Sequence, residues 1–128
     1  MTHLFDVRVY YEDTDFGGIV YYANYLKFIE RARSEMVREM GINQKSMKED
    51  GIIFAVRKVE ANYLAPALYD DMLQVRTIIG DTSAVRAVFE QQVWRGDTMI
   101  FTADVTIVCI GEDGRPTRLP AVIRRNLH

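Results

Sequence analysis

Cysteine and histidine are scarce in this chain, and their scarcity excludes several kinds of active site. The single cysteine, Cys109, rules out an intrachain disulfide. The two histidines, His3 and His128, lie at opposite ends of the sequence. A catalytic triad needs a histidine beside its nucleophile, and a zinc site needs clustered histidines or cysteines. We therefore expect neither a triad nor a metal site.

A long apolar run and an excess of basic residues are also lacking. No stretch approaches the roughly 20 apolar residues that a membrane-spanning helix needs, and residues 1–15 show no secretory signal pattern. We expect a cytoplasmic protein without membrane insertion. Sixteen Lys and Arg against eighteen Asp and Glu give a net charge of -2, which disfavours nucleic acid as a partner.

The 128 residues show no repeat and no change in composition, which predicts a single domain over residues 1–128. Apolar and polar residues alternate over residues 4–11, which predicts a strand. Residues 22–40 change to a period of 3.6, with apolar side chains along one stripe, and predict one long helix. A short polar helical turn is expected over residues 43–50.

The remainder of the chain is typical of strands separated by Gly, Asp and Pro. Strands are predicted over residues 52–64, 72–79, 84–94 and 98–110. The Gly-Asp pairs that follow the second and third of these stretches are hairpin signals, so the strands should pair antiparallel. No helix-length pattern separates them, which excludes repeated parallel crossovers. We predict an α+β protein whose antiparallel sheet buries the long helix.

The segment EDTDFGGIVYYANY, which joins the first strand to the helix, concentrates the chemically active groups. A calcium loop that starts at Asp13 is excluded, because Asn24 stands where a bidentate glutamate is needed. Asp13 and Asp15 can serve as turn and cap residues only. In the alternative, the glycines let the backbone approach a ligand, and free amides near Tyr22 form an oxyanion hole beside a carboxylate.

The lack of an internal histidine also restricts the leaving group. Cleavage of an ester or an amide needs a general acid to protonate the group that leaves. A thiol has a pKa near ~8.5 and leaves as a thiolate without such help. A carboxylate beside an oxyanion hole therefore suits a thioester better than an amide.

Three stretches of the sequence resemble the acyl-CoA thioesterases of the hotdog fold: YYEDTDFGGIVYYANYLKFIERAR, VRKVEANYLAPALYDD and TIVCIGEDGRPTRLP. The similarity is to the 4-hydroxybenzoyl-CoA thioesterase-like family, closest to its Tol–Pal-associated branch. It implies an antiparallel sheet of five to six strands wrapped around one long helix. It also implies subunits joined edge to edge into a homodimer or homotetramer, with active sites at the interface. An apolar strand edge near residues 52–56 favours such pairing.

The resemblance also implies roles for individual residues. Asp15 matches the catalytic carboxylate, acting as nucleophile or as general base to water, whereas Asp13 is structural. The amide of Tyr22 matches the group that polarises the thioester carbonyl. The residues implied around the substrate are Gly18, Tyr22, Tyr25 and Val56.

Acyl-CoA is the implied substrate, hydrolysed to a carboxylic acid and free CoA without a cofactor. Relatives in the hydroxybenzoyl branch hold the CoA phosphates with basic residues in a loop that is uncharged here, at residues 82–85. Arg57 and Lys58 are therefore the candidates for binding CoA. A second candidate group is Arg118, Arg124 and Arg125.

The sequence leaves several alternatives open. One is a module that binds acyl-CoA or an acyl-carrier protein without turnover. Another is a hotdog dehydratase or hydratase, although such enzymes normally need a histidine. The acyl group is either short and aliphatic, or aromatic. Both remain open because Tyr22 matches the tyrosine of the hydroxybenzoyl branch, whereas the Tol–Pal branch commonly has histidine at this position.

Overall fold

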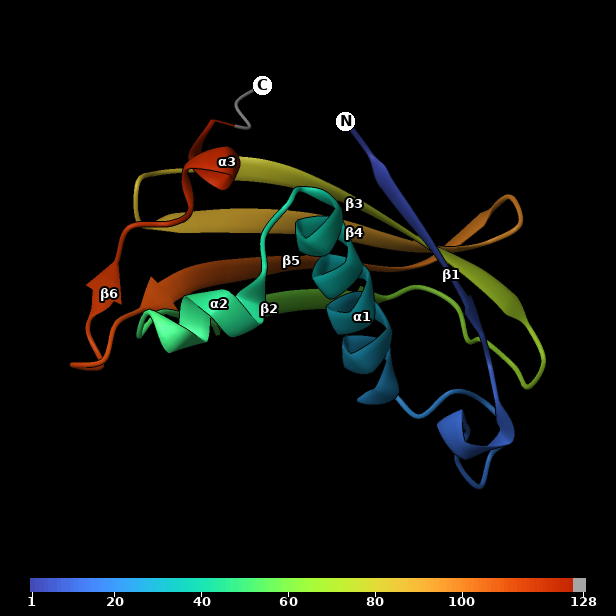
Figure 1. Cartoon of the computed structure of the whole chain (residues 1–128). Coiled ribbons are helices and arrows are strands. Elements are labelled where there is room, and N and C mark those ends of the chain that lie inside the picture. The colour runs from blue at the N-terminus through green and yellow to red at the C-terminus, as the bar shows by residue number, and fades with distance from the viewer. Residues whose placement is uncertain (126–128) are drawn as a thin grey trace.

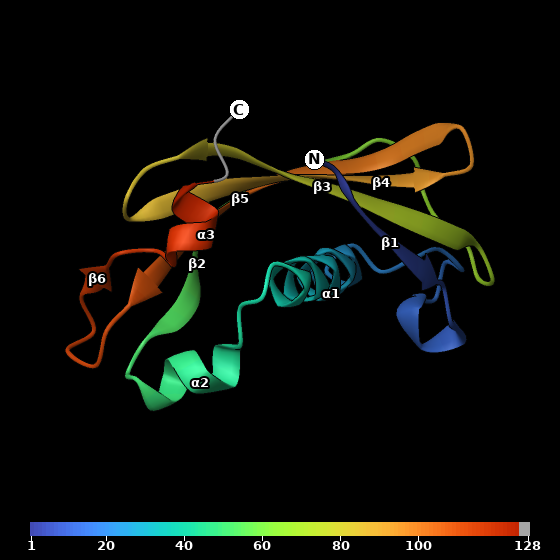
Figure 2. The ribbon, with the colours of Figure 1, turned by 45° about the horizontal axis from the view of Figure 1, so that its top comes forward.

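The structure is a computed structural model that describes residues 1–125 of the chain. A curved antiparallel sheet lies over one long helix, α1 (Asn24–Glu39) (Figures 1 and 2). The strands are β1 (His3–Arg8), β2 (Ile53–Tyr63), β3 (Met72–Thr82), β4 (Arg86–Arg95), β5 (Thr98–Ile110) and β6 (Pro116–Thr117). The shorter elements are the 3-10 turn η1 (Tyr11–Asp13) and the helices α2 (Gln44–Glu49) and α3 (Ala121–Arg124). The predicted α+β fold is confirmed.

Helix α1 packs its apolar stripe against the concave face of the sheet. The buried residues of the helix recur every three or four positions and are Tyr25, Phe28, Ile29, Ala32, Met36 and Val37. On the sheet they meet side chains such as Phe89 and Phe101, which are at most 1% exposed. Gly41, with φ of +90°, takes the left-handed conformation that commonly ends a helix. The helix begins and ends within two residues of the predicted range.

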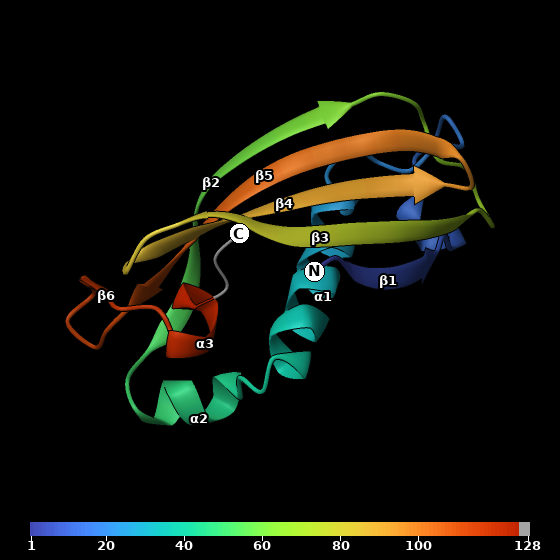
Figure 3. The same cartoon turned by 90° about the horizontal axis from the view of Figure 1, so that it is seen from above.

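The strands follow the order β1-β3-β4-β5-β2, and β6 pairs with β5 (Figure 3). The predicted hairpin at Gly96 is confirmed, since β4 and β5 pair on either side of it. The predicted hairpin between β3 and β4 is confirmed, but its turn lies after Thr82 rather than at residues 80–81, because β3 continues to Thr82 and the turn follows at Ser83. A Cβ on Gly80 would lie 2.0 Å from a carboxylate oxygen of Glu90, so this glycine leaves room for the side chain of Glu90 from the neighbouring strand.

Among residues 1–125, strand β2 pairs with β5 alone and forms one edge of the sheet. The register shifts between Val56 and Lys58, which makes Arg57 a bulge residue. Val56, Val59 and Tyr63 pair with buried residues of β5 and therefore face the concave side. These three side chains, which we call the uncovered row, stay between 40% and 51% exposed in a single copy, although the ring of Tyr63 contacts Tyr25 of α1.

Candidate active site

The segment between η1 and α1 forms a tight turn held by main-chain hydrogen bonds. The N–H of Asp15 donates to the carbonyl of Ile19 at 2.9 Å, and the N–H of Gly18 donates to the carbonyl of Asp15 at 3.0 Å. Gly18 has φ of +82°, a conformation that side chains rarely adopt. A bridge between Ile19 and Leu68 ties the turn to the segment that follows β2. Gly18 thus shapes the turn that presents Asp15.

Asp13 connects the end of the first strand to the start of the helix. Its carboxylate accepts the N–H of Tyr10 at 2.7 Å. Its main-chain carbonyl accepts the N–H of Tyr21 at 2.9 Å and the side-chain amide of Asn24 at 3.0 Å. These contacts span η1 and the start of α1, so Asp13 has the geometry of a structural residue.

Asp15 differs from Asp13 because its side chain is exposed and makes one local contact, accepting the N–H of Gly17 at 2.8 Å. Neither aspartate caps α1, since the residue at the N-cap is Ala23 and no side chain caps the helix there. A capping role at α1 is therefore wrong for both residues, whereas Asp13 does cap the turn η1 by accepting the N–H of its N-cap residue, Tyr10. The contact with Gly17 leaves the second carboxylate oxygen of Asp15 open to a ligand.

The start of α1 offers amide groups beside this carboxylate. Within residues 1–125, the N–H groups of Tyr22 and Ala23 have no hydrogen-bond acceptor. The hydroxyl of Tyr63 donates to the carbonyl of Tyr22 at 2.9 Å and fixes this peptide against the end of β2. Unbonded amides at a helix start attract negative charge.

Asp15 and Tyr22 line one open pocket of about 430 Å³, which we call the Asp15 pocket. Tyr25 and Tyr63 form part of its wall. The ring of Tyr25 stacks on Phe101 with centroids 4.8 Å apart, and its hydroxyl oxygen accepts the N–H of Ala67 at 3.1 Å. Burial raises the pKa of Tyr25, so this phenol stays protonated and serves as a wall of the pocket.

Val56, Arg57 and Lys58 lie away from Asp15 within one chain. Val56 lines a second pocket, beside Arg33 of α1. Lys58 faces the convex side of the sheet, where its ammonium nitrogen is 2.8 Å from a carboxylate oxygen of Glu60. Together with Arg86 of β4, Arg57 and Lys58 line an open depression on that side.

The other reactive side chains are remote from the Asp15 pocket. The ring nitrogen Nε2 of His3 contacts Glu39 at the opposite end of α1, and His128 lies outside the described residues. Burial raises the pKa of the Cys109 thiol to about 11. Across residues 1–125, no three His, Cys, Asp or Glu side chains cluster as metal ligands. No helix in the same range is both long and apolar enough to cross a bilayer.

The sequence model of the thioesterase-like superfamily matches residues 9–127. The chain belongs to this superfamily. The family resemblance of the acidic segment and helix is thereby confirmed. Among curated members, acyl-CoA thioester hydrolase YbgC of Escherichia coli O6:H1 is 42% identical over 119 residues, which cover 91% of this chain and 89% of the relative.

Solved thioesterase structures share the fold along almost the whole chain. A probable thioesterase from Bartonella henselae has a TM-score of 0.87 and 42% identity, covering 94% of this chain and all of the other. An Asp→Asn mutant of 4-hydroxybenzoyl CoA thioesterase, complexed with 4-hydroxybenzoyl CoA, has a TM-score of 0.88 and 26% identity, with 95% of each chain covered. These superfamily members establish the hotdog thioesterase architecture of the chain.

Proposed function

We propose that this superfamily member hydrolyses an acyl-CoA thioester to a carboxylic acid and free CoA, with Asp15 as the reactive group. The N–H of Tyr22 holds the carbonyl oxygen of the substrate. The observation that carries the proposal is that an exposed carboxylate and an unbonded amide at a helix start line one pocket. The relative named acyl-CoA thioester hydrolase supports the substrate class.

Asp15 has two chemically balanced routes. As a nucleophile, its carboxylate adds to the thioester carbon, the C–S bond breaks, CoA leaves as a thiolate, and water hydrolyses the remaining mixed anhydride. As a general base, it takes a proton from water while the water oxygen adds to the same carbon, and the tetrahedral intermediate expels the thiolate. In both routes the N–H of Tyr22 stabilises the negative oxygen.

The CoA phosphates are assigned to the basic side of the sheet. Arg57, Lys58 and Arg86 contribute three positive charges around the convex depression, and Glu60 and Asp104 contribute two negative charges. Lys58 is already paired with Glu60 and Arg86 with Asp81, so Arg57 is the strongest phosphate ligand of this set.

We further propose a homodimer, formed by antiparallel pairing of β2 with β2 of a second copy, and a homotetramer made of two such dimers. Strand β2 offers eleven residues of open edge. The uncovered row lies along its concave side and remains exposed in a single copy. Long apolar edges of this kind favour pairing with another strand.

A thiol-release assay over acetyl-, butyryl-, benzoyl- and 4-hydroxybenzoyl-CoA tests the proposal. We expect at least one substrate to reach a kcat/KM of about 10⁴ M⁻¹s⁻¹, the lower end of ordinary enzymes. Slow release from every member, with binding retained, would instead favour a module that holds acyl-CoA without turnover. Addition of water to an enoyl-CoA without thiol release would favour a hydratase.

A further inference from the structure

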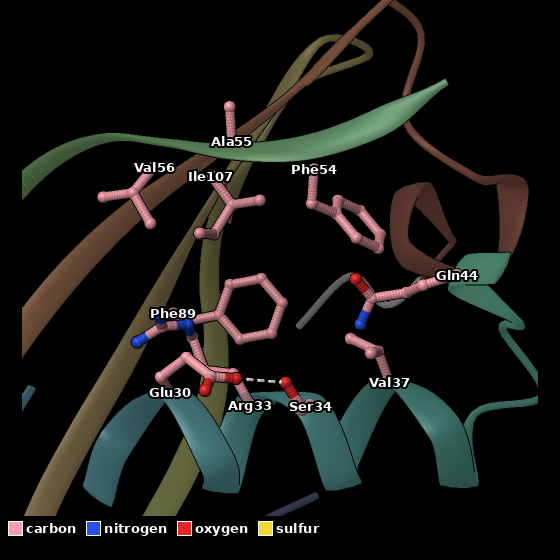
Figure 4. A pocket seen from close by; sticks show the side chains of 10 residues that line it. All are labelled: Glu30, Arg33, Ser34, Val37, Gln44, Phe54, Ala55, Val56, Phe89 and Ile107. Atoms are coloured by element: carbon pink, nitrogen blue, oxygen red, sulfur yellow. Dashed lines mark hydrogen bonds between the residues drawn. The ribbon is translucent and has the colours of Figure 1, made fainter. Parts of the chain in front are cut away.

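A second pocket of about 180 Å³ lies between the C-terminal half of α1 and strands β2, β4 and β5 (Figure 4). We call it the Arg33 pocket. Its walls are largely apolar, and its polar groups are the side chains of Glu30, Arg33, Ser34 and Gln44. A protein cavity of about 150 Å³ holds a benzene ring, so this pocket has room for about six non-hydrogen atoms.

Arg33 is held in this pocket by a buried polar network. Its guanidinium donates to the side-chain oxygen of Gln91 at 3.0 Å. Gln91, only 1% exposed, donates in turn to the carbonyl of Ile29 at 2.9 Å and the hydroxyl of Thr77 at 3.0 Å. The network fixes one edge of the guanidinium, which carries five N–H donors in all.

Within the described chain, Arg33 forms no ion pair, although Glu30 lines the same pocket. Burial lowers the pKa of the Arg33 guanidinium, while the charge of Glu30 acts in the opposite direction. Glu30 itself accepts the hydroxyl of Ser34, as Figure 4 shows. A partly buried guanidinium with free donors is suited to an anionic ligand.

The Asp15 pocket of the same copy is too distant to share a small ligand with Arg33. Arg33 follows Tyr22 by eleven residues of α1 and its first turn, a rise of about 16 Å at ~1.5 Å per residue. Between them the buried rings of Tyr25 and Phe28 pack against the sheet. The two pockets have no lining residue in common.

Edge pairing of two copies removes this distance. Counting Arg57 as a bulge, an antiparallel β2–β2 pair with its two-fold axis at Val59 sets Tyr63 of one copy opposite Phe54 of the other, on the same face of the sheet and at the usual strand spacing of about 4.8 Å. Tyr63 lines the Asp15 pocket, and Phe54 lines the Arg33 pocket. In this arrangement the Asp15 pocket of one copy opens toward the Arg33 pocket of the second copy.

We propose that the Arg33 pocket receives the far end of the acyl group and selects acyl groups that end in a carboxylate. This inference rests on the proposed function and names its substrate class, the CoA monothioesters of dicarboxylic acids. The planar guanidinium of Arg33 donates two parallel hydrogen bonds to the carboxylate. Apolar residues such as Val56 and Ile107 contact the methylene groups of the acyl chain. Room for about six non-hydrogen atoms beyond the thioester carbonyl corresponds to a glutaryl or adipoyl group.

The test compares acyl groups that differ only at the far end. Hydrolysis of glutaryl- and adipoyl-CoA is measured against pentanoyl- and hexanoyl-CoA, in the wild type and in Arg33→Met. We expect the kcat/KM ratio of carboxylate-ended to neutral substrate to fall by about 10- to 100-fold in Arg33→Met, the usual effect of a lost charged hydrogen bond. An unchanged ratio would overturn the proposal.

Three further variants control for charge and folding. Arg38→Met removes an exposed arginine of the same helix, paired with Glu35, and should leave the ratio unchanged. Glu30→Gln removes the nearest negative charge and should raise the ratio several-fold. Arg33→Lys keeps the charge without the fork and should give an intermediate ratio; should Arg33→Met fail to fold, a wild-type ratio in Arg33→Lys and Glu30→Gln would overturn the proposal.

Binding separates this inference from the proposed function. The dissociation constants of unreactive adipoyl- and hexanoyl-CoA analogues, with a methylene in place of the sulfur, are measured in the wild type and in Arg33→Met. If no thioester is hydrolysed, the proposed function fails, yet an Arg33-dependent preference for the adipoyl analogue of at least ~10-fold still supports the pocket assignment. Equal affinities of the wild type for both analogues would overturn it.

Discussion

The two pockets along α1 differ in the groups that would bind a ligand: main-chain amides in one and side chains in the other. In the Asp15 pocket, the donors that position a ligand are main-chain amides at the start of the helix, next to one exposed carboxylate. In the Arg33 pocket, the donors are side chains fixed by a buried network. Main-chain donors depend on the backbone conformation of the turn before α1, so most substitutions leave them in place. Side-chain donors are lost or altered whenever the residue that carries them is replaced. The first pocket should therefore set the rate for every substrate, and the second should set their ranking.

The largest expected effect is that of Asp15→Asn. The amide keeps the shape and can still accept the N–H of Gly17, but it lacks the charge and the basic lone pair that either route needs. We expect a folded protein that binds substrate and loses at least ~10²-fold in kcat for all acyl groups. Steady-state kinetics and analytical ultracentrifugation measure these two properties.

Asp13→Asn is the matched control, since the same chemical change is made two residues away. Its side chain can still accept the N–H of Tyr10, so kcat should stay near normal and any effect should be on stability. Retention of more than a tenth of the normal kcat in Asp15→Asn would contradict the catalytic assignment.

The second-largest effect is expected at the open edge of β2, where the proposed pairing of two copies brings the two pockets together. Val59 is 40% exposed in one copy and becomes covered in the proposed dimer. Val59→Glu should therefore leave the single copy folded but shift the mass by light scattering from a multiple of 14.8 kDa toward 14.8 kDa. Glu60→Lys, on the convex face of the same strand, should keep at least the dimer. A wild type that is monomeric at micromolar concentration would contradict edge pairing and the shared site.

A smaller effect is expected from the basic residues of β2, which belong to neither pocket. If Arg57 and Lys58 bind the CoA phosphates, replacing both with Ala should raise KM about 3- to 10-fold with little change in kcat, because such a contact is equally strong in the ground state and the transition state. The increase should shrink at high salt. Unaltered KM and salt dependence would direct attention to the alternative group, Arg118, Arg124 and Arg125.

Tyr25→Phe tests whether the wall of the Asp15 pocket takes part in the chemistry. The substitution removes the acceptor of the Ala67 N–H and keeps the stack on Phe101. Leaving a buried amide unpaired costs about 1–3 kcal/mol, so we expect that loss in the free energy of unfolding with kcat changed less than about threefold. A large loss of kcat at unchanged stability would instead place the hydroxyl in the reaction.

The sequence predicted what depends on local pattern. The long helix followed from the spacing of its apolar residues. Of the six strands described, β1 followed from alternation and β2 to β5 from runs bounded by turn residues. Resemblance, rather than periodicity, distinguished Asp15 from Asp13, because both aspartates look alike as turn residues. The structure then separated the two by their contacts.

The sequence could not predict what depends on packing between distant segments. Gly80 looked like a turn residue because the approach of Glu90 from the neighbouring strand is invisible along the chain. Val56 was expected near Asp15, and only the strand register shows that one copy keeps them apart. One feature of the sequence could have indicated that Arg33 is partly buried: it lies next to the apolar stripe of α1 rather than on the opposite face.

The smallest effect concerns Cys109, which faces Phe54 across β5 and β2 at the Arg33 end of the sheet. Burial raises the pKa of this thiol from 9.0 to about 11, so the folded state favours the neutral form. Its contribution to stability is complete below pH 9 and is lost as the pH rises through about 11. The free energy of unfolding of the wild type should therefore fall relative to that of Cys109→Ala between pH 9 and 11, and the difference should be constant below pH 8. A thiol reagent should modify the native protein slowly at pH 8 and the denatured protein quickly. Fast modification of the native protein would show that this end of the sheet opens, and the Arg33 pocket would then lack the rigid wall that distinguishes it from the exposed turn of Asp15.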